Sequence, residues 1–148
     1  MSIAVDVSRE GVRIALSEQR VREVVRAVCR REHVRDALVS VTFVTNARMA
    51  RLNREFLGHK GATDVITFQL HANGPGARRD AAVIGDIYIA PQVAGANARE
   101  RGIGIREELA RLVIHGTLHV LGYIHDEGDQ RMTGEMWRRQ EALIAAIV

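Results

Sequence analysis

The order of apolar patterns along the chain limits the fold more than any other feature of the sequence. Residues 3–7 alternate apolar and polar side chains, and residues 40–44 form a β-branched and aromatic run, so each predicts a strand. After each strand, apolar residues recur at helical spacing. This predicts one helix that is capped by Ser17 and runs to about Arg31, and a second that is capped by Thr45 or Asn46. The first strand has an alternative continuation as a hairpin near 12–14.

The second half of the chain adds two strands and then turns helical. TDVITF and GDIYIA predict strands on either side of a loop from His71 to Ala82, and helices are expected from Pro91, from Ile105 and over about 129–147. With no repeat or composition break, the 148 residues predict one α+β domain, 1–148, with a small sheet of about four strands and about five helices.

Composition excludes several classes of protein. No apolar run reaches the roughly 20 residues of a membrane span, and MSIAVDVSRE lacks the features of a signal peptide, so we expect a cytoplasmic protein. Cys29 is the only cysteine, which excludes an internal disulfide and favours a core position. The net charge of +3 comes almost wholly from arginine, with Lys60 the only lysine, and modestly favours an anionic partner.

The segment HGTLHVLGYIHDEG carries the chemistry, because it places three histidines within eleven residues. His115 and His119 are i and i+4, so a helix projects both imidazoles from one face, with Cβ atoms about 6 Å apart. His125 would point elsewhere if that helix continued. Gly122 lies where a helix would stop, since glycine adopts the left-handed conformation without a Cβ penalty, and the chain can then return His125 to the same metal.

Three neutral imidazoles leave one position of a zinc tetrahedron for water, which is typical of catalytic sites. The lone cysteine excludes a cysteine-rich structural site. Zinc lowers the pKa of its water to about 7, so hydrolysis by a metal-bound water is the predicted reaction class. The spacing predicts one metal ion per chain, and zinc is the expected one. Nickel and iron stay open, because imidazole binds all three metals.

The pattern is close to the protease signature HExxHxxGxxH, but Gly116 stands where those proteases have glutamate. Glycine has no side chain to accept a proton, so peptide hydrolysis by that mechanism is disfavoured. A protease or amidase with its base at Asp86, Asp126 or Glu127 stays open as an alternative.

HGTLHVLGYIH resembles the signature of the YbeY family of bacterial ribosomal-RNA maturation factors, and LNREFLGHKGATDVITF and GDIYIA resemble the family's upstream segments in the same order. The resemblance implies a mixed sheet with the metal helix packed centrally, zinc on His115, His119 and His125, and a single-strand-specific endoribonuclease. It also implies action on small-subunit ribosomal RNA, in its maturation and in ribosome quality control, with the small subunit as partner.

Two positions depart from the family pattern. Leu57 stands where many members have arginine, which removes a phosphate contact; Arg54, His59 and Lys60 are the candidates to replace it as substrate-binding residues. Ile124 replaces the aspartate before the third histidine. Asp126, directly after it, is a candidate to orient a ligand histidine.

The general base, the cleavage site, the protein partners and the oligomeric state stay open at this point. Attack by water and internal attack by the RNA 2′-hydroxyl are both compatible with the sequence. A ribosome assembly factor whose metal only stabilises the fold is a further alternative. Trp137, Met132 and Met136 are expected to serve packing at the core and its rim.

Overall fold

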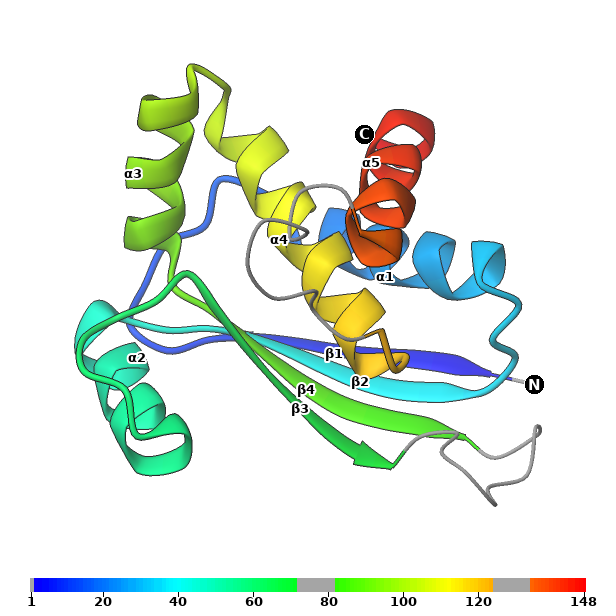
Figure 1. Ribbon diagram of the computed structural model, residues 1–148, viewed down its shortest axis with the longest axis horizontal. Helices are drawn as coiled ribbons and strands as arrows, with labels where there is room; N and C mark the ends of the chain where they lie inside the picture. Colours follow the sequence, from blue (N-terminus) through cyan, green and yellow to red (C-terminus); the bar gives the residue numbers. More distant parts are fainter. Residues whose placement is uncertain (1, 72–81, 124–133) are drawn as a thin grey trace.

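The fold is seen in a computed structural model that describes residues 2–71, 82–123 and 134–148. The elements follow the predicted order (Figure 1). They are β1 (Ile3–Arg9), α1 (Glu18–Arg31), β2 (Ala37–Phe43), α2 (Asn46–Leu52), the π-helical turn η1 (Asn53–Leu57), β3 (Val65–His71), β4 (Val83–Ile89), α3 (Pro91–Arg101), α4 (Ile105–Val120) and α5 (Glu135–Ile147).

The four strands form one mixed sheet in the order β1-β2-β4-β3. β1, β2 and β4 run parallel, while β3 pairs antiparallel with β4 at the edge. The α+β class, the four strands and the five α-helices confirm the sequence prediction. The alternative hairpin near 12–14 is wrong, because those residues form no strand and β1 pairs with β2 instead.

Side chains predicted to cap helices do so. The Ser17 hydroxyl accepts a hydrogen bond from the Arg20 amide, and the Thr45 hydroxyl accepts one from the Arg48 amide. Each cap satisfies one of the amides that a helix leaves without a carbonyl partner at its first turn. The caps therefore determine where α1 and α2 begin, and Thr45 rather than Asn46 caps the second helix.

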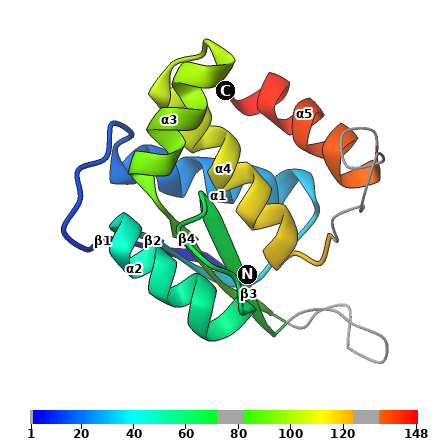
Figure 2. The same ribbon diagram turned by 60° about the vertical axis from the view of Figure 1, so that its left-hand side comes forward.

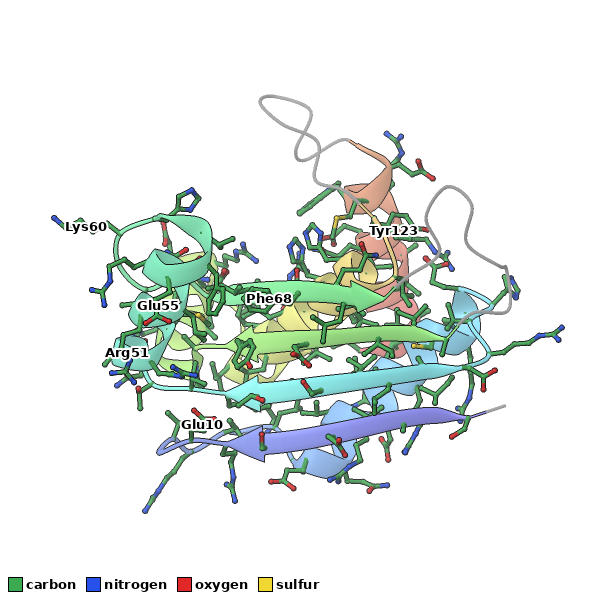
Figure 3. The ribbon with its side chains drawn as sticks, turned by 90° about the horizontal axis from the view of Figure 1, so that it is seen from below. Glu10, Arg51, Glu55, Lys60, Phe68 and Tyr123 are labelled. Carbon is green, nitrogen blue, oxygen red and sulfur yellow. The ribbon has the colours of Figure 1, made fainter. Side chains whose placement is uncertain are left out.

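Helices α1 and α4 pack on one face of the sheet, and α5 lies on the same side, packed against α4 and α1 (Figure 1). α4 lies in the middle of this layer, where it packs against α1, α3, α5, β3 and β4 (Figure 2). None of the described helices crosses the strands on the opposite face of the sheet, and α2 with η1 stands at one end of it (Figure 3). None of the described helices combines the length and apolarity that crossing a bilayer requires.

The main core lies between the sheet and these helices. Its largest members have almost no exposed surface and come from every layer, among them Phe43, Ile87, Leu109, Ile114 and Leu118. Cys29 is also fully buried in this core, as expected. The position of α4 is therefore determined on several sides at once, which gives its cavity-facing residues a rigid support.

Candidate active site

Two histidines on α4 lie side by side. The ring centroids of His115 and His119 are 4.8 Å apart and the ring planes meet at 73°. They come from successive turns of one buried helix, so the i, i+4 spacing produces the closeness that the sequence predicted.

Each of these rings has its Nδ1 atom engaged by an oxygen. His115 Nδ1 lies 2.6 Å from Gln140 Oε1 of α5, and His119 Nδ1 donates to the Tyr123 carbonyl at 3.0 Å. A proton on Nδ1 leaves the lone pair on Nε2, the atom that a neutral histidine then offers to a metal. The hydrogen bonds thus orient both rings and select the tautomer that suits metal binding.

The Tyr123 carbonyl reaches His119 because α4 stops where the sequence predicted. Gly122 has a φ of 113°, in the region that favours glycine. Its amide bonds to the His119 carbonyl and the Tyr123 amide bonds to the Leu118 carbonyl, the two bonds of a Schellman motif. Gln69 of β3 donates to the Val120 carbonyl at 3.1 Å, which ties the same helix end to the sheet.

Burial keeps His115 neutral. It lowers the pKa of His115, and the hydrogen bond to Gln140 and the negative charge of Asp64 oppose this only in part. A neutral imidazole is the form that binds a metal. Asp64 itself accepts hydrogen bonds from the Asn97 side chain and the Val65 amide, so its carboxylate is held beside the site.

Both histidines line a cavity of about 550 Å³ between α4, α5, the C-terminal end of α3 and β3 with the residues before it. Trp137 and Met136 of α5 lie on it, Met136 as a buried core residue. Its charged lining residues are Asp64, Arg101, Glu108 and Arg111. A cavity of this size with few charged groups is typical of a small-ligand or active site.

The remaining predicted metal-site residues lie outside the described part of the chain. His125, Asp126, Glu127 and Met132 all fall within 124–133. Among residues 2–71, 82–123 and 134–148 no group of three histidine, cysteine or carboxylate side chains is close enough to hold a metal. The pair on α4 therefore needs a third ligand from elsewhere, and the role of His125 stays a prediction.

The structure separates Leu57 from its proposed substitutes. Leu57 lines the cavity, whereas Arg54, His59 and Lys60 do not. They lie on η1 and the loop after it, exposed to solvent, and Lys60 stands at the outer end of this segment (Figure 3). Their predicted contact with substrate would therefore be made outside the cavity.

Asp86 does not serve the site. The sequence left Asp86 open as the base of a protease, but Asp86 lies in the middle of β4 and accepts a 2.6 Å hydrogen bond from Ser40. Its neighbours Gly85 and Ile87 face α4, so the alternation of a strand places Asp86 on the other face of the sheet. This removes one of the three bases considered for a protease.

Gly116 faces the sheet. A Cβ atom added to it would lie 2.8 Å from Ile87 Cγ2, so the position where proteases have their glutamate is here directed into the core. A carboxylate at this place could not serve as a base without being buried among apolar groups.

The sequence patterns did not point to Gln140, Asp64 or the charged cluster of Arg101, Glu108 and Arg111. Gln140 lies 25 residues from His115, so no local pattern links them. The sequence did contain a signal for Glu108. A carboxylate on the buried side of a helix needs a cationic partner, so its position on that side would have indicated a nearby arginine.

Comparison with known proteins agrees with this geometry. The profile of the family described as "Endoribonuclease YbeY" matches residues 4–148. The chain belongs to the YbeY family. Members from Mycolicibacterium paratuberculosis and Mycobacterium marinum are 36% identical over 148 residues, which is 96% of this chain and 82% of each relative. A member from Syntrophus aciditrophicus is 29% identical over 143 residues, covering 97% of this chain and 89% of the relative.

The fold is also similar to a solved one. A solution structure of a Thermotoga maritima protein superposes with a TM-score of 0.64 at 27% identity, covering 97% of this chain and 88% of that one. The YbeY relatives carry the name endoribonuclease.

Proposed function

We propose that the chain is a single-strand-specific, zinc-dependent endoribonuclease that matures small-subunit ribosomal RNA and acts in ribosome quality control in the cytoplasm. The observation that supports this proposal most is the pair of α4 histidines, each oriented through its Nδ1 atom at the wall of the cavity. Membership of a family whose relatives are named endoribonucleases supports RNA as the substrate class.

The proposed ligands are His115, His119 and His125, as one metal site in a single domain of residues 1–148. The two described members fit a metal, because burial favours the neutral form of His115 and the Nδ1 atom of each ring is engaged by an oxygen. When bound there, zinc supplies a Lewis acid that neutralises charge on a phosphate oxygen and acidifies a water. Gln140 and Tyr123 hold the two rings against rotation, and residues of α5 and β3 line the cavity beside them.

Cleavage of single-stranded RNA with and without chelator tests the proposal. The purified protein should contain about one zinc ion per chain, and chelation should abolish cleavage until zinc is returned. His119→Ala should remove cleavage while the fold survives, as judged by circular dichroism. His33→Asn is the control, because it also removes an imidazole. The backbone of His33 has a φ of 60°, a conformation that asparagine adopts readily.

The outcomes separate the alternatives. Cleavage that is unaffected by the chelator contradicts a metal-dependent nuclease. Loss of the fold in His119→Ala favours an assembly factor with a structural metal. A cyclic phosphate at the product end indicates internal attack by the 2′-hydroxyl, and a 5′-phosphate indicates attack by water.

A further inference from the structure

The cavity contains two arginines that share one buried carboxylate. Arg101 ends α3 and Arg111 lies on α4, and both approach Glu108 of α4. Arg101 Nη1 lies 3.1 Å from Glu108 Oε1, and Arg111 Nε lies 4.0 Å from the same oxygen. All three residues line the cavity that holds His115 and His119.

Glu108 is the buried carboxylate that both arginines approach. Its side chain is 0% exposed, and the atom that they approach is Oε1. Burial raises the pKa of Glu108, and the charge of Arg101 counteracts that effect. A buried carboxylate holds nearby cations strongly, because an unpaired charge in the interior is costly.

The two arginines differ in how many N–H donors remain for a further ligand. Arg111 is 16% exposed and lies between two carboxylates, since its Nη2 also donates to Glu141 Oε1 at 2.6 Å. Arg101 is 52% exposed, and its only hydrogen bond or ion pair within the described ranges is the one from Nη1 to Glu108. A guanidinium has five N–H donors, so Arg101 retains donors for a second anion.

The position of Arg101 also fits a phosphate. Glu108 precedes His115 by seven residues on α4, which is about 10 Å along a helix axis. Arg101, held at Glu108, therefore lies about two helical turns from His115, on the wall of the same cavity. Leu57 contributes no charge to this wall, and Arg54, His59 and Lys60 do not line it.

We propose that Arg101, held by Glu108, binds a backbone phosphate of single-stranded RNA next to the one that is cut. This inference rests on the proposed function and names a substrate-binding residue for it. Glu108 acts through Arg101 as a positioning residue. A guanidinium held by a carboxylate is oriented before the strand arrives, so less side-chain freedom is lost on binding.

The salt dependence of binding tests the contact directly. The probe is a short single strand of fully 2′-O-methylated RNA with phosphorothioate linkages, and binding to the zinc-loaded protein is followed by fluorescence anisotropy at several salt concentrations. Electrophoresis of the recovered strand checks that it stays intact. Each phosphate contact on a single strand contributes about 0.7 to the slope of log K against log salt.

Arg101→Gln should weaken binding roughly tenfold at low salt and reduce the slope by about 0.7. Arg101→Lys should keep the slope, because it keeps the charge, and lose a smaller part of the affinity. Arg99→Gln is the control: it removes the same charge from an exposed position of α3 that does not line the cavity. It should leave the slope unchanged.

An unchanged slope in Arg101→Gln, or an equal loss in Arg99→Gln, overturns the proposal. If Arg101→Gln does not fold because Glu108 loses its nearer cation, Glu108→Gln with and without Arg101→Gln gives the comparison without a buried charge. The readout is binding rather than cleavage. A strand that binds with an Arg101-dependent slope but is not cut as unmodified RNA contradicts the proposed function and supports the Arg101 contact.

Discussion

Gly116 of α4 lies so close to Ile87 of β4 that an added Cβ atom would be 2.8 Å from Ile87 Cγ2 and 3.3 Å from Ile87 Cδ1. The contact sets how near the histidine helix approaches the sheet. Gly85 of β4 serves the same interface from the other side, since a Cβ there would meet Val120 of α4 and the Phe68 carbonyl oxygen.

Gly116→Ala should therefore destabilise the protein. Crowding a packed core costs about 1–3 kcal/mol, and the better helix propensity of alanine returns at most about 1 kcal/mol. Urea denaturation monitored by the single Trp137 measures the change in the free energy of unfolding.

Gly95→Ala in α3 is the matched control. Its nearest neighbours to an added Cβ lie at 3.7 and 3.9 Å, so the substitution meets only ordinary contacts. It should stabilise the protein by up to about 1 kcal/mol. A Gly116→Ala variant as stable as Gly95→Ala would show that the helix can move away from Ile87.

Gln140→Met should weaken zinc binding by roughly 10- to 100-fold, because His115 loses the oxygen that orients its ring. Competition against a chromogenic zinc chelator measures the affinity. Gln140→Glu keeps an acceptor oxygen and should lose much less. Equal affinities in all three proteins would mean that His115 does not need this partner.

The metal-free protein should lose stability on acidification, through His115. Burial lowers the pKa of His115 below its ordinary value of 6.5, so below that value the unfolded chain binds a proton that the folded chain does not. This contribution is complete above pH 6.5 and is lost as the pH falls towards the lower folded pKa.

Urea midpoints between about pH 7.5 and pH 5.5, with chelator present, follow this loss. His115→Gln removes the titrating group while keeping a polar side chain. The free energy of unfolding of this variant should therefore depend less steeply on pH, and the difference in slope corresponds to the uptake of less than one proton on unfolding. Parallel pH profiles for the two proteins would exclude a contribution from His115.

Cys29 should be unreactive in the folded protein. It is fully buried, and burial raises the pKa of its thiol to about 11, so little thiolate forms near neutral pH. A disulfide reagent at about pH 8 should modify it only as fast as the protein unfolds. Fast labelling under native conditions would mean that the core around α1 opens readily.

Much of the candidate site follows from local chemistry in the sequence. The i, i+4 spacing places His115 beside His119, and Gly122 ends the helix because few other residues adopt its φ of 113°. The caps at Ser17 and Thr45 likewise depend on residues only three positions apart. That residues 1–148 act as one domain and that His125 completes the metal site stay predictions.

The rest was decided by contacts between segments far apart in the chain. The sequence determined the elements, their order and the pair of histidines, because helix periodicity, capping and glycine turns act over a few residues. Only the tertiary structure brought Gln140 to His115 and turned Asp86 to the opposite face. Such pairings depend on how α4 packs between the sheet and α5, and packing between distant segments leaves no pattern of its own in the sequence.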